Sequence, residues 1–181
     1  MNIIKTRTDL LGLLPKGLRI AELGVFKGDF SKEILSICEP SKLYLVDLFE
    51  GEVSSGDKDG ENTETVPDLN YHYQLLKEKY KGTNVEVIKG DTLDFLLSMP
   101  ELDAVYIDSL HTFGQVWNEL LLSAHLKYIL GHDYDNIDVK NAVDLFCNKS
   151  GKVLTYLTED KCPSYLIKEN PFFIFPPKTW K

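Results

Sequence analysis

Short apolar runs and helical repeats of apolar residues follow each other along this chain almost to its end. Apolar runs typical of strands occupy residues 17–24, 42–47, 84–91, 102–108, 127–133 and 152–158. Apolar residues at helical spacing occupy residues 30–39, 69–82, 92–100, 112–126 and 137–151. This alternation predicts parallel strands with helices on both faces of the sheet.

The end of the chain departs from that alternation. Residues 163–177 indicate two short strands around a turn at Glu169–Asn170, closed by Pro176 and Pro177. Two strands without an intervening helix predict an antiparallel hairpin at an edge of the sheet. We therefore expect an α/β fold, a doubly wound and mostly parallel sheet with a C-terminal antiparallel hairpin, in one domain over residues 1–181.

A long polar segment separates the second strand from the next helix. Residues 48–68 are rich in glycine and acids, with almost nothing apolar after Val53. A loop of this length in a compact domain is usually a lid, a binding loop or disordered. We expect the acidic part, Glu50–Asp68, to act as a lid that excludes water from a bound ligand.

Composition narrows the setting of the protein. The chain has 181 residues, of which 43% are hydrophobic and 27% charged, with a formal net charge of -8. The negative charge argues against binding by a broad basic surface, so we expect no nucleic acid partner. No apolar stretch is long enough for a membrane span. Cys38, Cys147 and Cys162 form no close pair, which favours a soluble, cytoplasmic protein.

The first strand ends in an unusual turn. In "IAELGVFKG", Glu22 is followed by Gly24 and Gly28 with the spacing E-x-G-x-x-x-G, and Val25 and Phe26 make the turn bulky and apolar. A dinucleotide site would require G-x-G-x-x-G. An acid beside an apolar turn suits a ligand with an ammonium group and no phosphate, such as S-adenosylmethionine. The alternative is that both glycines only serve the turn.

Acids also end the next three strands, and ligands of such sheets bind at these ends. Asp47 is placed to accept the hydroxyls of a ribose, and Asp91 or the N–H of Thr92 to meet an adenine edge. Asp108 ends the fourth strand. For Asp91, helix capping explains the acid equally well. The neighbours Leu48 and Gly90 complete the expected cofactor-binding set.

Four segments, "AELGVFKG", "YIDSLHTF", "LGHDY" and "VKNAVDLF", resemble a small stand-alone family of class I S-adenosylmethionine-dependent methyltransferases with the pattern YIDxxH…GHDY…VKxAV. The resemblance covers about Leu18 to Ile174. It implies a seven-stranded sheet whose last strand is antiparallel, and methyl transfer from the sulfonium. The resemblance assigns Glu22, Gly24 and Gly28 to the methionine side, Asp47 to the ribose, and Asp91 and Thr92 to the adenine. It places Asp108 beneath the methionine end or at the reacting centre.

Two departures from the family pattern stand out. The Pro-Gly-Gly turn common before the fifth strand is absent from "SAHLKYILGHD", and Phe113 replaces a common tyrosine.

Four residues form the expected catalytic set. His111 follows Asp108 by three residues, and His132 with Asp133 ends the neighbouring strand. Two imidazoles and two carboxylates can accept a proton from an acceptor hydroxyl. Asp108 and Asp133, with Asp135, could instead hold magnesium, as in related O-methyltransferases. The histidines argue for a softer metal or none, and we expect no metal.

The sequence therefore predicts an S-adenosylmethionine-dependent methyltransferase that O-methylates a small-molecule or sugar-like acceptor. N-methylation and self-association into a homo-oligomer stay open. Two other functions on the same fold also stay open: a non-catalytic cofactor-binding module and a dinucleotide-dependent oxidoreductase. The missing third glycine counts against the oxidoreductase.

Overall fold

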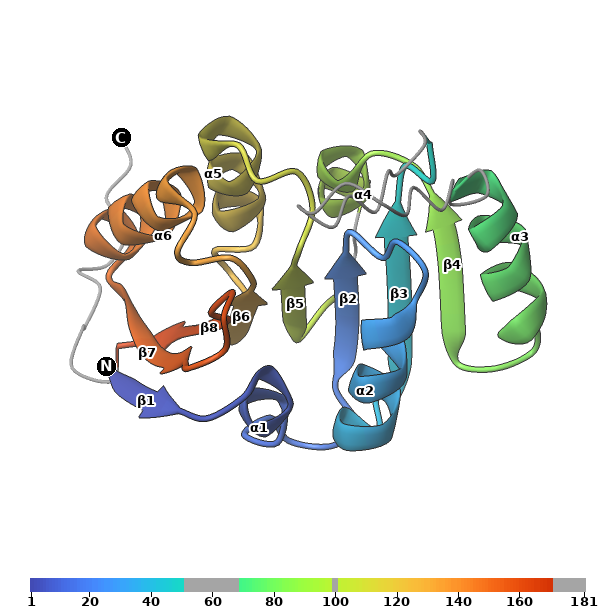
Figure 1. The fold of residues 1–181 in the computed structure, drawn as a ribbon, viewed down its shortest axis with the longest axis horizontal. Coiled ribbons are helices and arrows are strands. Elements are labelled where there is room, and N and C mark those ends of the chain that lie inside the picture. The colour runs from blue at the N-terminus through green and yellow to red at the C-terminus, as the bar shows by residue number, and fades with distance from the viewer. Residues whose placement is uncertain (51–68, 99–100, 171–181) are drawn as a thin grey trace, which may run out of the picture.

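The computed structural model describes residues 1–50, 69–98 and 101–170, which form one eight-stranded sheet with helices on both faces (Figure 1). The strands are β1 (Asn2–Ile4), β2 (Arg19–Leu23), β3 (Lys42–Asp47), β4 (Val85–Lys89), β5 (Ala104–Ile107), β6 (Tyr128–Gly131), β7 (Lys152–Thr158) and β8 (Tyr165–Glu169). The helices are α1 (Arg7–Leu11), α2 (Asp29–Cys38), α3 (Leu69–Lys79), α4 (Thr92–Ser98), α5 (Phe113–Leu122) and α6 (Ile137–Ser150).

The strand order is β1-β7-β8-β6-β5-β2-β3-β4, and every pairing is parallel except those of β8. Strand β8 lies antiparallel between β6 and β7. The predicted fold class is confirmed. The antiparallel hairpin differs from the expected one, because it joins β7 to β8 and β8 lies inside the sheet and not at its edge. The expected strand number of seven is corrected to eight. The second strand expected after Asn170 lies outside the described residues, as does nearly all of the expected lid.

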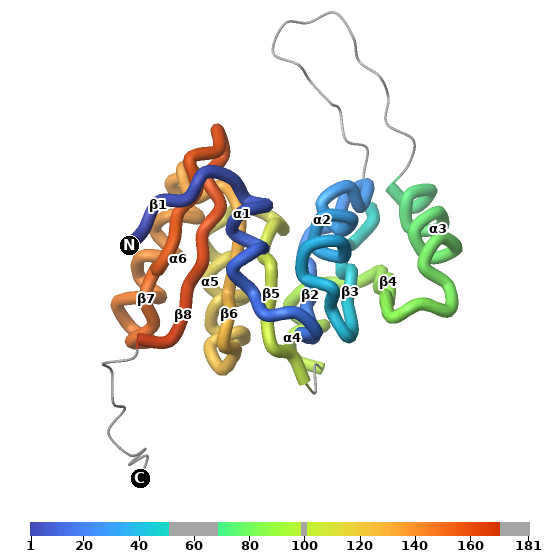
Figure 2. Tube along the Cα trace, turned by 90° about the horizontal axis from the view of Figure 1, so that it is seen from below, coloured from blue at the N-terminus to red at the C-terminus, as the bar shows by residue number. Residues whose placement is uncertain are grey.

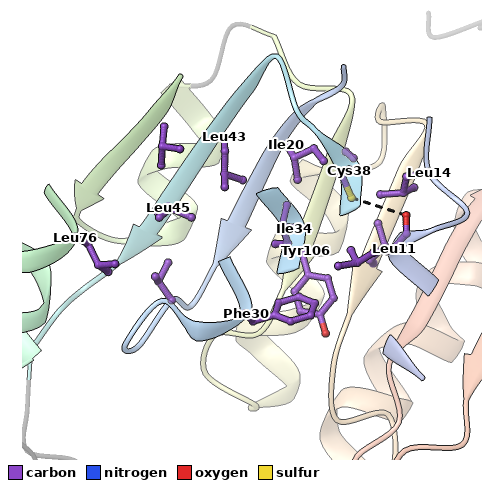
Figure 3. Close-up of a cluster of buried hydrophobic side chains, with 14 of the residues drawn as sticks. Leu11, Leu14, Ile20, Phe30, Ile34, Cys38, Leu43, Leu45, Leu76 and Tyr106 are labelled. Atoms are coloured by element: carbon purple, nitrogen blue, oxygen red, sulfur yellow. Dashed lines mark hydrogen bonds between the residues drawn. The ribbon is translucent and has the colours of Figure 1, made fainter. Parts of the chain in front are cut away.

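Two apolar layers enclose the sheet because successive side chains of a strand point to opposite faces. In β2, Ile20 packs with α1, α2 and α3, whereas Ala21 packs with α4, α5 and α6. Figure 3 shows part of the first layer, where the rings of Phe30 and Tyr106 approach to 4.4 Å between centroids. Both layers leave the ends of the strands uncovered, so polar groups can gather there.

The N-terminal segment is the eighth strand, and the sequence pattern did not reveal it. Asn2 to Ile4 pair in parallel with Tyr156 to Thr158 of β7. Figures 1 and 2 accordingly show the blue N-terminal segment beside the red C-terminal strands. Three residues are too few for a periodicity to be recognised. Helix α1 follows immediately and packs Leu10 and Leu11 into the first apolar layer.

Within the described ranges, no helix combines the length and the apolar character that crossing a bilayer requires.

Candidate functional site

The arrows of β2, β3, β4 and β5 end at one edge of the sheet, as their parallel pairing requires (Figure 1). A cavity of about 660 Å³ opens at this edge. Its volume lies within the roughly 300–1,000 Å³ typical of small-molecule and cofactor sites. The wall is formed by Arg7, Glu22, Gly24, Val25, Phe26, Lys27, Asp29, Phe30, Asp47, Leu48, Glu50, Leu69, Asp91, Thr92, Asp108, Ser109, Leu110 and Gln115.

Every residue of the expected cofactor-binding set lines this cavity except Gly28 and Gly90. Gly28 begins α2 with a φ of 75°, and a Cβ there would lie 2.6 Å from the Leu76 side chain. The positive φ favours glycine at this position, and the end of the Leu76 side chain would have to shift to admit a Cβ. Gly90 lies in a separate depression beside β3 and β4. The cofactor roles of the remaining residues stay predictions.

The turn after β2 requires a glycine at position 24. Gly24 has a φ of 87°, and a Cβ would lie 2.0 Å from the Asp108 backbone oxygen. Its N–H donates to the Val46 oxygen of β3 at 2.9 Å. The turn therefore sits tightly between the ends of β3 and β5, and its bare backbone faces the cavity.

Asp47 fastens that turn to β3. Its Oδ2 accepts the N–H groups of Val25 at 2.7 Å and Phe26 at 2.9 Å, and its Oδ1 accepts the N–H of Phe49 at 2.7 Å. Phe26 and Phe49 both have a positive φ, a conformation that non-glycine residues rarely adopt. A single carboxylate thus stabilises two strained residues, and a ribose contact would use its remaining lone pair.

Glu22 is a buried acid in the wall of the cavity. Only 1% of its surface is exposed, and Ser31 Oγ donates to its Oε2 at 2.5 Å. Burial raises the pKa of the Glu22 carboxyl to about 8, since the Ser31 hydrogen bond and the Arg7 charge offset burial only in part. A cationic group in the cavity would favour the ionised form.

Asp91 serves α4 as a cap. Its Oδ1 accepts the N–H groups of Leu93 at 2.8 Å and Asp94 at 3.2 Å. The capping alternative for this acid is therefore observed in the structure. The carboxylate still lines the cavity. Contact with an adenine stays a prediction.

A buried acid that the sequence analysis missed lies behind this part of the wall. Glu119 Oε1 accepts hydrogen bonds from Thr92 at 2.5 Å, Ser109 at 2.7 Å and Gln115 at 3.0 Å. Burial raises the pKa of its carboxyl, although these three bonds act against it. The acid fixes three side chains of the cavity wall. Its signal in the sequence was a glutamate among the apolar residues Val116 and Leu120.

The four residues expected to be catalytic lie together at the ends of β5 and β6. His111 Nε2 lies 3.3 Å from Asp108 Oδ1 and 3.2 Å from Asp133 Oδ2. His132 Nδ1 lies 3.5 Å and 3.1 Å from the same two oxygens. Each imidazole is therefore held between two carboxylates, and Asp108 also belongs to the cavity wall.

The electrostatics of the cluster follow from this arrangement. Burial raises the pKa of the Asp108 carboxyl, but hydrogen bonds from both histidines outweigh burial and bring it below its usual range. The Asp108 hydrogen bond raises the pKa of His111 against burial. Burial lowers the pKa of His132, but the two carboxylates outweigh it and the net pKa is raised. The cluster therefore retains a proton more readily than free imidazole does.

Among the residues that the structure describes, two groups of side chains have ligand atoms close enough for a metal ion. Asp108, His132 and Asp133 form one, with ligand atoms within 4.8 Å of one another. Asp133, Asp135 and Cys162 form the other. Asp133, just after β6, belongs to both groups, while Asp108 follows β5 and Cys162 lies between β7 and β8.

The cavity also contains side chains that the sequence analysis missed. Arg7 comes from α1, Phe30 from the first turn of α2, and Ser109, Leu110 and Gln115 from the start of α5 and the residues before it. Ser109, Leu110 and Gln115 lie within four residues of His111. Their closeness to the "YIDSLH" segment could have indicated that they belong to the site. Arg7 had no such signal, because it reaches the cavity only through the pairing of β1 with β7.

Comparisons with known proteins agree with this geometry. A family model described as a methyltransferase domain matches residues 21–134, from β2 to just beyond the histidine cluster. A search of curated proteins finds no match.

Solved structures resemble the chain at low sequence identity. TrmN from Thermus thermophilus matches with a TM-score of 0.62 and 14% identity over 91% of this chain and 47% of its own, so the chain spans about half of that protein. A protein assigned as an rRNA methylase from Clostridium thermocellum has a TM-score of 0.61, 14% identity and coverages of 94% and 99%. A protein assigned as a caffeoyl-CoA O-methyltransferase from Staphylococcus aureus has a TM-score of 0.59 and 16% identity. The match covers 90% of this chain and 82% of that protein.

These neighbours overturn one expectation. The net charge of -8 led us to expect no nucleic acid partner. That exclusion is wrong, because structures with this fold include the protein assigned as an rRNA methylase. Net charge is a sum over the whole surface, whereas binding of a nucleic acid depends on local patches and on the pocket.

Proposed function

Since the chain belongs to the methyltransferase-domain family, we propose that it transfers a methyl group from S-adenosylmethionine to a hydroxyl of a small-molecule or sugar-like acceptor. One observation carries the proposal. Asp108 lines the cavity and also contacts both histidines of the cluster, so the donor site and a proton acceptor share a residue.

The residues of the cavity fit the donor. At one end, Glu22 and Asp108 offer carboxylates to an ammonium or sulfonium group. The bare backbone of Gly24 allows close approach, and the turn lacks the third glycine expected for a pyrophosphate. At the other end, Asp47 and Asp91 have acceptor capacity left for polar groups of a nucleoside.

When bound, S-adenosylmethionine supplies a methyl group on a positively charged sulfur. Transfer requires an acceptor oxygen held in line with that methyl, and removal of its proton. His111 is the more accessible imidazole, with 37% of its side chain exposed against 17% for His132. We assign proton acceptance to His111, while Asp108 and Asp133 orient the ring and stabilise its charged form.

Transfer of labelled methyl groups tests the proposal. The panel contains a sugar, a phenol and a short RNA, and we expect label on an oxygen of one of the first two. His111→Gln with His132→Gln should bind the donor as the wild type does, with turnover lowered by about 10²–10⁴-fold. The exposed His125 is the matched control, and His125→Gln should turn over normally.

The other outcomes are equally informative. Label on RNA alone would overturn the proposed acceptor class while leaving the reaction intact. Donor binding with no label on any acceptor would support the non-catalytic module. We expect turnover to persist in EDTA, and loss of turnover that Mg²⁺ or Mn²⁺ restores would reassign the cluster as metal ligands.

A further inference from the structure

The cavity contains a cation from outside the segment that the family model matches. Arg7 lines the wall together with Glu22 and Asp108, whereas the family match begins at residue 21. The Arg7 guanidinium carbon lies 4.3 Å from the centroid of the Phe30 ring. Across residues 1–50, 69–98 and 101–170, its guanidinium makes no ion pair within 4.0 Å.

The backbone holds Arg7 firmly in place. Thr6 caps α1 in a reciprocal capping box with Asp9. The N–H of Arg7 donates to Asp160 Oδ2 at 2.7 Å, which ties the first turn of α1 to the segment between β7 and β8. With the pairing of β1 and β7, these contacts fix the direction in which the side chain leaves the backbone. The guanidinium is therefore presented at the cavity and is not a freely moving surface group.

Arg7 lies at the same end of the cavity as the two acids that suit an ammonium group. The Phe30 ring beneath its guanidinium lies 4.4 Å between centroids from the ring of Tyr106 in β5. Asp108 directly follows β5, and Tyr106 pairs with Glu22 of β2. A cation near two acids complements a zwitterion, whose ammonium faces the acids and whose carboxylate faces the cation. Arginine matches a carboxylate especially well because its planar fork donates two parallel hydrogen bonds.

We propose that Arg7 binds the α-carboxylate of the methionine part of the donor and thereby selects donors that carry this carboxylate. The inference rests on the proposed function, since it presumes that S-adenosylmethionine occupies the cavity. It adds a residue supplied by the N-terminal segment to the donor site. The stacking of Arg7 on Phe30 is consistent with this role, because the ring positions the guanidinium and leaves its N–H groups available to a carboxylate.

Calorimetric binding of two donors tests the assignment without any turnover. S-adenosylmethionine and its decarboxylated form differ only in the carboxylate. The wild type should bind the first about 10- to 100-fold more tightly, as expected for a charge-assisted bidentate contact. Arg7→Gln should bind both with nearly the same Kd, close to that of the wild type for the decarboxylated form. Arg7→Lys should retain part of the preference, because it keeps the charge and loses the fork.

Lys27 provides the matched control, because it is another cation in the wall of the same cavity. Lys27→Gln should change the Kd values of both donors by the same factor and keep the preference. Asp160 does not line the cavity. Asp160→Ala should nevertheless reduce the preference for the donor with the carboxylate, because the first turn of α1 loses its hydrogen bond to Asp160.

Failure of the inference differs from failure of the proposed function. If Arg7→Gln weakened both donors equally, Arg7 would only stabilise the cavity and the assignment would be overturned. A wild type that preferred neither donor would overturn it as well. A wild type that bound neither donor would instead refute the donor site itself.

Discussion

The two halves of the cavity edge use the same kind of residue in different ways. At the ends of β3 and β4, Asp47 and Asp91 accept backbone N–H groups. At the ends of β5 and β6, Asp108 and Asp133 face the imidazoles of the cluster. The first pair fixes the shape of the chain, and the second surrounds groups that can exchange protons.

This difference shows that an acid at the end of a strand can have either a structural or a chemical role. A carboxylate bonded to backbone N–H groups holds the local chain in place, so its loss should appear in the free energy of unfolding. A carboxylate beside imidazoles controls their protonation, so its loss should appear in turnover. Variants on either side of the cavity can therefore separate structural from chemical roles.

The largest effect is expected from Asp108→Asn. The variant keeps the shape of the side chain but removes the charge that faces both histidines. Turnover should fall by at least about 100-fold, while the free energy of unfolding changes by less than about 1 kcal/mol. Labelled methyl transfer and urea unfolding measure the two. Comparable turnover in variant and wild type would remove the distinction between the halves.

Asp47→Ala should show the opposite pattern, a loss of about 2–3 kcal/mol in the free energy of unfolding. Three backbone N–H groups lose their acceptor, and two of them belong to residues with positive φ. Urea unfolding measures the loss. A free energy of unfolding within about 0.5 kcal/mol of the wild type would show that the turn after β2 is stable without the Asp47 carboxylate.

Glu22→Gln should stabilise the protein at high pH. The folded protein retains the Glu22 proton up to a pKa of about 8, whereas the unfolded chain releases it near 4.5. Between these values the folded state binds more protons, so the contribution of Glu22 to stability falls as pH rises. We expect the variant to exceed the wild type by about 1–2 kcal/mol at pH 9 and to match it at pH 4. Urea unfolding at several pH values measures the difference. The same difference in the free energy of unfolding between variant and wild type at pH 4 and pH 9 would contradict this prediction.

The smallest effect is expected from Asp91→Ala, about 1 kcal/mol from the lost cap of α4. Asp91→Asn should retain most of the stability, because asparagine caps helices as well as aspartate does. Urea unfolding compares the two variants. If both also lost affinity for the donor to the same extent, the carboxylate would serve the cavity in addition to the helix.

Strands β2 to β8 were predictable as short apolar runs and most of the connections between them as helical repeats, whereas β1 and the place of β8 inside the sheet were not. The meeting of Asp108, His111, His132 and Asp133 was predictable for the same reason, since parallel neighbours end at one edge. What each acid binds was not. Asp91 accepts N–H groups of the residues that follow it, Asp47 mainly those of the turn after β2, and Asp108 faces two imidazoles.

Contacts between segments far apart in the sequence could not be predicted from the pattern of apolar and polar residues either. Arg7 and Asp160 are separated by 153 positions, and neither lies in a periodic stretch. Glu119 occupies a helix whose apolar neighbours were recognised, but its three donors come from different elements. Such contacts depend on tertiary packing, which the spacing of residues along one element does not specify.

The pairing of Asn2–Ile4 with residues 156–158 makes β1 depend on a strand about 150 positions later in the sequence. During synthesis, β2 to β6 can assemble while β1 and α1 still lack the strand that anchors them. The protein would then pass through a stage with a nearly complete sheet but without the wall that Arg7 supplies. Ligand affinity of a nascent or nicked chain would therefore report whether β1 has paired with β7.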